Sequence, residues 1–422
     1  MPHPKGYIKR QAKRLTKGEI NRRRFVMSAL SAGVTMPTAL SLASRAEAQT
    51  PKQGGTLRIA MADGIAQATP AARLAAFAIG NSLTEVAQDG SLVGELAREF
   101  GTPDGGATWV FDLRQGVTFH DGRSLTSADV LATLATFAHG MELRATDPHQ
   151  VVVTLPEPDP AFARKLADPR FVTRPEGDDQ QIGTGPYVLE AEDARGTLRL
   201  TRNPDYWKPG RAHFDRVELS TLPEISARQQ AILAGDVDYT DGIDPRALAL
   251  LQRAPNVGVL EVACGRHIAV TAEGAPSVLN TLQNRLPYQE LLDRILLGHG
   301  TAGGADAPAR PSSMSETLRL AVFNDGVPRT MEAASLIAER LSEHGVPVDL
   351  IPTTDPSARA EAHARIAWQR QDPAVEGRAP DSLVALWAND ISAHSAALTH
   401  GPDLATNYEN DGARLIERWW FA

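Results

Sequence analysis

Short runs of alternating apolar and polar residues recur along the chain and predict several strands. Residues 54–61, GGTLRIAM, alternate after paired glycines and predict the first strand. Residues 108–122, TWVFDLRQGVTFHDG, alternate, break at Gln115-Gly116, resume, and end in the turn dipeptide Asp121-Gly122. This pattern is typical of a hairpin-like pair of strands. Residues 149–158, HQVVVTLPEP, predict another strand that is closed by prolines.

Apolar residues at helical spacing separate these strands. Residues 124–137, SLTSADVLATLATF, predict a helix with Thr126 or Ser127 as its N-cap. Residues 223–241, PEISARQQAILAGDVDYTD, predict a helix that stops at Gly235 and a short strand after it.

The second half of the chain contains a strand–helix–strand unit. Residues 317–323 alternate, residues 329–345 form one apolar helical face that ends at Gly345, and residues 346–351 alternate again. Such a unit predicts two parallel strands joined by a crossover helix, and the fold class is therefore α/β. Residues 271–315 are rich in Gly, Ala, Pro and Ser, with a helical piece at 288–297, and predict an irregular connection between two lobes.

The first 48 residues have the composition of an export signal. Nine Lys and Arg precede residue 25 against one acid, an apolar stretch follows, and Ala46-Glu47-Ala48 has the pattern of a cleavage site. Residues 21–27, NRRRFVM, are similar to the twin-arginine (Tat) signal. We expect residues 1–48 to be a removed Tat-type signal peptide and the mature protein to be periplasmic, with the Tat export machinery as one partner.

Net charge and cysteine content limit the partners and the covalent links that the protein can have. The full chain has 43 basic and 51 acidic residues, a net charge of −8, and residues 49–422 alone carry −16. Nucleic acid and anionic lipid would be repelled by this charge. Cys264 is the only cysteine, so the sequence offers no thiol for a lipid anchor near the cleavage site and no intramolecular disulfide.

Signatures of catalysis and of metal binding are lacking in the sequence. The 11 histidines have no His-x-x-x-His or His-Glu-x-x-His spacing, and no nucleophile elbow or phosphate-binding loop occurs. His120-Asp121 lies in a turn, where adjacent residues rarely converge on one ion. We therefore predict no cofactor, no metal and no enzymatic activity.

Ordered motifs across residues 54–240 carry a family resemblance. The segments GGTLRIA, DGSLVGELAREF, WVFDLRQGVTFHDGRSLTSADV, GTGPYVLE and LTRNPDYWKPG, followed by a helix ending in Ala234-Gly235, appear in one order. This series resembles the extracellular solute-binding proteins of family 5, the peptide-, nickel- and oligopeptide-binding components of ATP-driven (ABC) importers. The resemblance implies a two-lobed α/β fold of the type II periplasmic-binding-protein kind, with an extra subdomain inserted in lobe I.

The resemblance also implies how the chain is divided. Lobe I is expected at residues 49–81 and 182–270, the inserted subdomain at 82–181, and lobe II at 271–422. The run at 183–210 is expected to shape lobe I, with Gly183 and Gly185 in tight turns. The chain ends at RLIERWWFA, where family members normally continue, so the return to lobe I is expected to be missing and the terminal Trp419, Trp420 and Phe421 to be exposed.

A segment near the C-terminus contains the residues that are candidates for contact with a ligand. Residues 383–398, LVALWANDISAHSAAL, resemble the family segment in which Trp-x-x-Asp follows a strand near the cleft. Carried over, Asp390 would accept the α-ammonium group of the ligand, and Trp387 would pack against the ligand beside it. Asn407 and Tyr408 lie where the family returns to the cleft and are further candidates. His394 could serve a nickel chelate, a weaker alternative.

The function implied is capture of a short peptide or similar amine-bearing solute between two lobes, with delivery to an inner-membrane permease by a monomer. Two alternatives remain open. The first is a degenerate or truncated paralogue with an interaction or sensory role. The second is a Tat-exported enzyme with a cofactor, which a lone cysteine and scattered histidines do not favour.

Overall fold

The computed structural model describes residues 51–422, apart from 65–68, 138–139, 178–181, 273–274, 284, 304–316, 324–328, 354–361, 371–381 and 402. Of the first fifty residues it describes 11, 14, 20, 22–32, 34, 36 and 39, which include helix α2 (Arg22–Ser31). Asn21 and the expected cleavage pattern at 46–48 lie outside the described residues. Within the described part of the chain, no helix combines the length and apolar character needed to cross a membrane.

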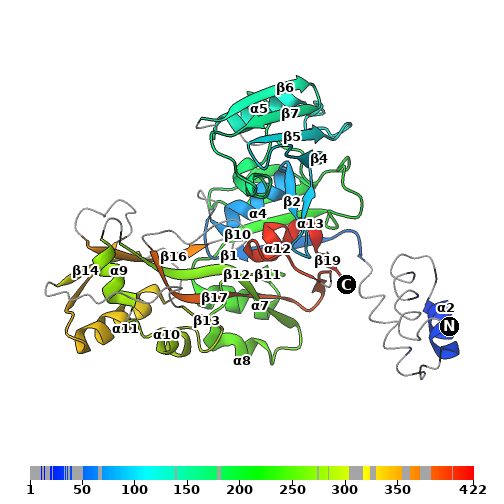
Figure 1. The fold of residues 1–422 in the computed structure, drawn as a ribbon. Coiled ribbons are helices and arrows are strands. Elements are labelled where there is room, and N and C mark those ends of the chain that lie inside the picture. Colours follow the sequence, from blue (N-terminus) through cyan, green and yellow to red (C-terminus); the bar gives the residue numbers. More distant parts are fainter. Residues whose placement is uncertain are drawn as a thin grey trace.

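One long sheet runs through both lobes (Figure 1). Its strands follow the order β15-β14-β16-β12-β17-β11-β1-β10-β9-β8, and β13 pairs with β17 beside this path. The bounds are β1 Thr56–Met61, β8 Tyr187–Glu192, β9 Leu198–Arg202, β10 Arg216–Thr221, β11 Tyr239–Thr240, β12 Val257–Thr271, β13 Gly300–Ala302, β14 Leu318–Phe323, β15 Val348–Thr353, β16 Ala364–Arg370 and β17 Ser382–Ser395.

Lobe I is built on β1, β10 and β11, which are mutually parallel neighbours, and on the antiparallel strands β9 and β8. Helices α4 (Pro70–Ile79) and α7 (Ile225–Ala234) belong to two separate apolar cores of this lobe. Short helices η2 (Pro245–Ala247) and α8 (Leu248–Leu251) follow β11. Gly235 ends α7 with a left-handed φ of 79°, which confirms the predicted stop.

Lobe II contains the strand–helix–strand unit that the sequence predicts. Strands β14 and β15 pair in parallel, and α11 (Thr330–Glu343) lies between them in the chain. Helices α9 (Pro276–Gln283) and α10 (Tyr288–Ile295) pack into the same apolar core. The stretch 271–315 is therefore more regular than predicted where it is described, because α9 and β13 join the expected α10.

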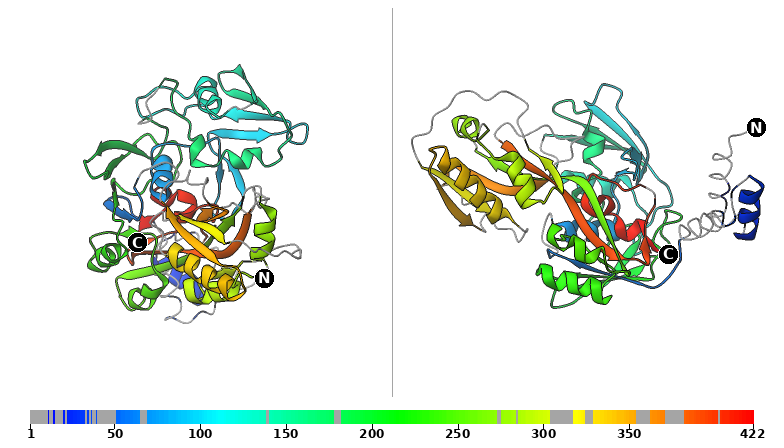
Figure 2. Two further views of the ribbon diagram at one scale, coloured as in Figure 1. Left: turned by 90° about the vertical axis from the view of Figure 1, so that its left-hand side faces the viewer. Right: turned by 90° about the horizontal axis from the view of Figure 1, so that it is seen from below.

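Strands β12 and β17 are long enough to belong to both lobes, and they pair with each other along almost their whole length (Figure 2). The register of β12 shifts between Ala263 and Arg266, opposite Asn389 and Ala388 on β17, so β12 has two extra residues at this point. Such a β-bulge bends a strand. The bulge lies between the part of β17 that pairs near lobe I and the part that pairs with β13 of lobe II.

A separate four-stranded sheet forms the inserted unit at the top of Figure 1. Its order is β4 (Ala97–Gly101), β5 (Thr108–Leu113), β7 (Gln150–Thr154) and β6 (Glu142–Asp147), with a core of its own. Helices α5 (Ser127–Ala135) and α6 (Phe162–Lys165), the turn η1 (Pro169–Phe171), and the strands β2 (Thr84–Val86) and β3 (Leu92–Gly94) complete it. Thr126, one of the two N-cap residues that the sequence predicts, caps α5, and Asp129 accepts its backbone N–H at 2.8 Å.

The hairpin expected within residues 108–122 does not form. Strand β5 pairs with β4 and β7 and not with the residues that follow it. Gly116, with a φ of 78°, turns the chain away, and Asp121-Gly122 closes a small loop in which Thr118 bridges Ser124. The two alternating runs therefore belong to different local structures.

The C-terminal residues return to lobe I, contrary to the expectation from the sequence. Helices α12 (Glu409–Ala413) and α13 (Leu415–Arg418) contact α4, and β19 (Trp420–Phe421) pairs with β18 (Leu398–Thr399) (Figure 1). Trp419 and Trp420 are buried. The ring of Trp419 packs edge-on against Tyr239 of β11, with centroids 5.7 Å apart.

Buried ion pairs hold the C-terminal residues against lobe I and explain why these residues are not exposed. Arg414 binds Glu95 at 2.7 Å, Arg418 binds Glu85 at 2.6 Å, and Lys208 binds Glu417 at 3.0 Å. Lys208 also binds Glu85 and Glu95. Charges removed from water in this way must be paired, so the last helix is held against both the inserted unit and the 183–210 run.

Candidate functional site

The carboxyl ends of three parallel strands meet at one edge of lobe I. The chain leaves β1 at Met61 and reaches Asp63, and it leaves β11 at Thr240 and reaches Asp241. Open α/β sheets bind their ligands at such edges, outside the carboxyl ends of the strands. Strand β17, which carries Asp390, is the antiparallel neighbour of β11 on its other side.

Four acidic residues gather here, and we call them the acidic cluster: Asp63, Asp241, Asp390 and Glu409. Asp241, Asp390 and Glu409 are 5%, 6% and 3% exposed, and Asp63 is half-buried. They come from two strand ends, from a strand and from α12, so the sheet order and the C-terminal return bring together residues far apart in the sequence.

Asp390 lies beside the β-bulge, where both lobes meet. Its Oδ1 is 3.7 Å from Nη1 of Arg266, the first residue of β12 after the bulge. Arg266 pairs with Ala388 on β17, and residues 388 and 390 project to the same face of the strand. The ion pair therefore spans the point at which β12 is bent.

Asp241 is held in a protonation state unlike that of a surface acid. Burial, and secondly the nearby charge of Asp390, raise its pKa to about 7. The backbone N–H of Ala62 donates to its Oδ1 at 2.9 Å. Burial also raises the pKa of Asp63, against the lowering effect of Arg266 and Arg228.

Three arginines accompany the acidic cluster, and each has a distinct role. Arg266 pairs with Asp390, and Arg73 of α4 pairs with Glu409. Arg228 of α7 is almost fully buried and donates to four backbone carbonyls, those of Leu222, Pro223, Asp241 and Gly242. Arg228 thus braces the loops that follow β10 and β11.

The acidic cluster has four carboxyl groups and three guanidinium groups beside it, and burial raises the pKa of two of the carboxyl groups, those of Asp241 and Asp63. Asp390 and Glu409 have cationic side chains as partners, whereas the direct hydrogen bonds to Asp241 and from Arg228 involve backbone atoms. A buried carboxylate in a region of low dielectric binds an ammonium group more strongly than a surface acid does.

A cavity of about 920 Å³ opens at the same strand edge. Ala62 to Gly64 after β1, Thr221 after β10 and the segment from Asp244 to Leu250 after β11 line it. Pro223 to Gln229, at the start of α7, complete the wall. Its size is that of a site for a small molecule or a short peptide.

The other residues predicted from the sequence are not all brought to Asp390. Trp387 is three residues earlier in a continuous strand, so it projects to the opposite face, where its ring lies 4.5 Å from that of His267. Asn407 is buried beside Gly412, and its Oδ1 has no hydrogen-bond partner among the described residues. Tyr408 donates its hydroxyl to Asp168, and the guanidinium of Arg73 lies 5.4 Å from the centre of its ring.

Two histidines considered from the sequence have structural partners. His120 lies 3.1 Å from the carbonyl oxygen of Gly185 through Nε2. His394 packs edge-on against Trp419, with ring centroids 5.7 Å apart. Among the described residues, no group of three or more His, Cys, Asp and Glu has an arrangement that could hold a metal ion.

Sequence analysis missed Asp63, Asp241, Glu409 and Arg266. The signal for the first two was present, because each follows the end of a predicted strand in an α/β pattern. Glu409 had no such signal, because α12 has a left-handed backbone at Asn410 and Asp411 that no residue pattern predicts.

These features define a class: a two-lobed α/β protein whose lobes share two long strands, with a buried charged site at their junction. Residues 91–286 match the family model described as bacterial extracellular solute-binding proteins, family 5 Middle. The match covers somewhat less than half of the chain, which is similar to this family over that stretch.

Two curated bacterial proteins are similar to this chain. The chain is 26% identical over 316 residues to di/tripeptide-binding protein 1 of Pseudomonas aeruginosa. The aligned region covers 63% of this chain and 59% of that protein. It is 23% identical over 277 residues to the glutathione-binding protein GsiB of Salmonella typhi, covering 56% of this chain and 54% of that one. The matched region thus spans somewhat more than half the length of these curated relatives.

Solved structures show the same fold over most of the chain. The binding protein AgaA of Agrobacterium tumefaciens, in complex with agropinic acid, superposes with a TM-score of 0.74 at 17% identity, covering 87% of this chain and 99% of that one. The periplasmic binding protein DppA of Helicobacter pylori, in complex with a peptide, has a TM-score of 0.72 at 14% identity, covering 88% and 98%. The predicted two-lobed α/β fold is therefore confirmed.

Proposed function

We propose that this protein is the solute-binding component of an ABC importer and captures a short peptide or similar amine-bearing solute between its lobes. The acidic cluster at the lobe junction is the observation that carries the proposal. Asp390 would accept the ammonium group of the solute, and that positive charge would favour the ionised forms of Asp241 and Asp63 nearby. Closure about β12 and β17 would then enclose the solute.

Several features support this proposal. The cavity of about 920 Å³ opens at the parallel strand edge beside Asp63, and Asp390 lies beside the β-bulge. The named relatives bind dipeptides, tripeptides or glutathione, all of which carry an α-ammonium group. The closed form would be delivered to an inner-membrane permease, and no covalent bond in the solute would be made or broken.

The setting proposed for this activity follows from the sequence. Residues 1–48 would direct export through the Tat machinery and be removed, leaving a periplasmic monomer. Lobe I would comprise residues 49–81 and 182–270, the inserted subdomain 82–181, and lobe II the residues from 271 onward. The C-terminal segment, which packs against α4, would complete lobe I.

Calorimetric titration of the mature protein with di- to pentapeptides tests the proposal. Asp390→Asn keeps the shape of the side chain and removes its charge, so we expect peptide affinity to fall by about tenfold or more. Asp205→Asn makes the same change at an exposed turn after β9 and should leave the affinity within about twofold. Equal affinities in the protein and in its Asp390→Asn variant would remove Asp390 from the site.

A further inference from the structure

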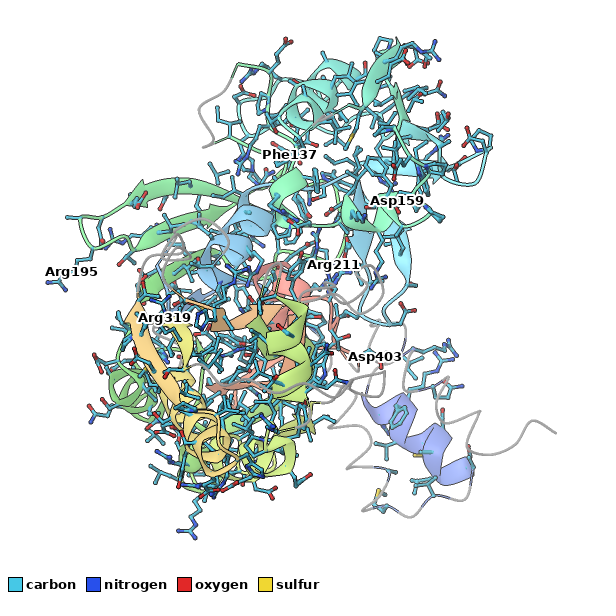
Figure 3. All side chains as sticks on the ribbon, turned by 60° about the vertical axis from the view of Figure 1, so that its left-hand side comes forward. Phe137, Asp159, Arg195, Arg211, Arg319 and Asp403 are labelled. Atoms are coloured by element: carbon cyan, nitrogen blue, oxygen red, sulfur yellow. The ribbon has the colours of Figure 1, made fainter. Side chains whose placement is uncertain are left out.

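A second cavity, of about 630 Å³, lies between α4 of lobe I and the inserted unit. Helix α4 contributes Ala72, Arg73 and Ala76, and the end of α5 contributes Thr133 and Thr136. Phe137, also in its wall, lies at the base of the inserted unit, on the side facing the rest of the molecule (Figure 3). The remaining wall is η1 and the residues after it: Pro169, Arg170, Val172, Arg174, Pro175 and Gly177.

The lining of this cavity has one sign of charge. Arg73, Arg170 and Arg174 belong to it, and none of its described lining residues is Asp or Glu. Alanine, valine, proline and phenylalanine side chains supply most of the remaining wall. Cationic groups in an apolar wall are suited to bind a carboxylate at the end of an aliphatic side chain.

Neighbouring groups outside the cavity hold the three guanidinium groups in place. Glu409 accepts from Arg73, and Asp168 accepts from Arg170 at 3.0 and 3.2 Å. Tyr408 joins these two pairs, because its ring faces Arg73 and its hydroxyl donates to Asp168. A cation fixed before binding loses less conformational entropy when its ligand arrives.

Arg174 is held from two sides. Its backbone N–H donates to the Thr133 hydroxyl at 3.2 Å, and its Nη1 donates to the carbonyl of Ile182 at 3.3 Å. Helix α5 and the segment that leads into β8 therefore set its position together.

The second cavity and the acidic cluster share a wall. The pair formed by Arg73 and Glu409 lines this cavity through Arg73 and belongs to the acidic cluster through Glu409. Both charges also act on the carboxyl of Asp63 at the end of β1. A solute whose ammonium group lies at the acidic cluster could therefore extend a second group toward the arginines.

We propose that the cavity between α4, α5 and η1 binds an acidic side chain of the solute, so that this protein selects amine-bearing solutes that carry a second, anionic group. The inference rests on the proposed function and adds a substrate class to it. Under it, Arg73, Arg170 and Arg174 determine specificity, whereas Asp390 serves every amine-bearing solute alike.

Calorimetric titration with two dipeptides of nearly equal shape tests this inference. Alanyl-glutamate carries a side-chain carboxylate, and alanyl-glutamine carries a neutral amide in its place. We expect the protein to bind alanyl-glutamate about tenfold more tightly or better. Titration of the C-terminal amides of both dipeptides should preserve this preference, because the terminal carboxylate is then absent from both.

Variants locate the source of the preference. In Arg174→Gln and in the largely exposed Arg170→Gln, the ratio of the two affinities should fall toward one, while the affinity for alanyl-glutamine stays within about twofold. Arg195→Gln changes an arginine in the exposed turn between β8 and β9 and should keep the full ratio. Far-ultraviolet circular dichroism of each variant checks that it is folded.

The outcomes separate this inference from the proposed function. Equal binding of the two dipeptides, a preference that is lost in the amides, or a preference unchanged in both cavity variants would overturn the inference alone. Failure of every dipeptide to bind would overturn the proposed function and the inference together.

Discussion

Asp241 shows how a single residue can make stability depend on pH at this site. Its pKa of about 7 in the folded protein lies well above the ordinary value of 3.8, chiefly because it is buried and secondly because Asp390 is near. In the unfolded chain the carboxyl ionises near its ordinary value. The folded protein thus binds one more proton between these two pH values, and its stability falls as pH rises through this window.

Asp241→Asn removes that titration. We expect the variant to gain stability relative to the parent protein as pH rises from 4 to 7, by about 4 kcal/mol at most, with a constant difference above pH 7. Urea unfolding at pH 5, 6, 7 and 8 measures this difference, with Asp205→Asn as the exposed control. A difference that does not change with pH would show that Asp241 ionises normally.

At the scale of elements, the 183–210 run forms β8 and β9 and fits closely against α4. Sequence analysis predicted that Gly183 and Gly185 form tight turns, but neither has a positive φ. Their role is close approach: a Cβ on Gly185 would lie 2.3 Å from the carbonyl carbon of Ile79, and one on Gly183 would lie 2.2 Å from its oxygen. The end of α4 leaves room only for glycine here.

Gly185→Ala is therefore expected to destabilise the protein by about 1–3 kcal/mol or more, because backbone atoms of α4 would have to move. Gly101→Ala in β4 is the matched control, since nothing lies within 4 Å of its added Cβ, and its stability should change by less than about 0.5 kcal/mol. Thermal unfolding followed by circular dichroism measures both. Equal stabilities of the two variants would contradict the packing argument.

Helices and strands in which apolar residues recur at a regular spacing could be predicted from the sequence. The acidic cluster could not. The helix ending at Gly235, the Thr126 cap and the unit from β14 to β15 each follow from local patterns within fewer than about forty residues. The acidic cluster depends on sheet order instead, because Asp63 and Glu409 meet only after the chain has built both lobes. The motif around Asp390 was found through family resemblance, but strand alternation, which separates Trp387 from it, was not applied.

At the scale of the whole molecule, the C-terminal segment joins three parts of the protein. One buried ionic network joins Glu85 and Glu95 of the inserted unit, Lys208 of the 183–210 run, and Arg414, Glu417 and Arg418 of the C-terminal segment. Because removal of any member would leave a buried charge unpaired, the inserted unit and lobe I are expected to move as one body. Relative motion is then left to lobe II.

Motion of lobe II is opposed by ion pairs that cross between the lobes. Asp244, after β11, accepts from Nη2 of the buried Arg329 at 2.7 Å, just before α11 begins. Arg246 reaches Glu332 of α11 at 3.3 Å, but both of these side chains are about half exposed. The first pair should therefore stabilise the closed arrangement of the lobes far more than the second.

Asp244→Asn tests this difference, since asparagine can still accept the backbone N–H of Arg246 that Asp244 accepts at 2.8 Å. We expect the solute-free variant to have a larger radius of gyration by small-angle X-ray scattering, and its peptide affinity to fall by about tenfold or more because closure is less favourable. Arg246→Gln removes the exposed pair and should leave the radius of gyration unchanged and the peptide affinity within about twofold. If Asp244→Asn behaves like Arg246→Gln, lobe closure is governed by the bulge in β12 and the solute alone, and the buried pair has no part in it.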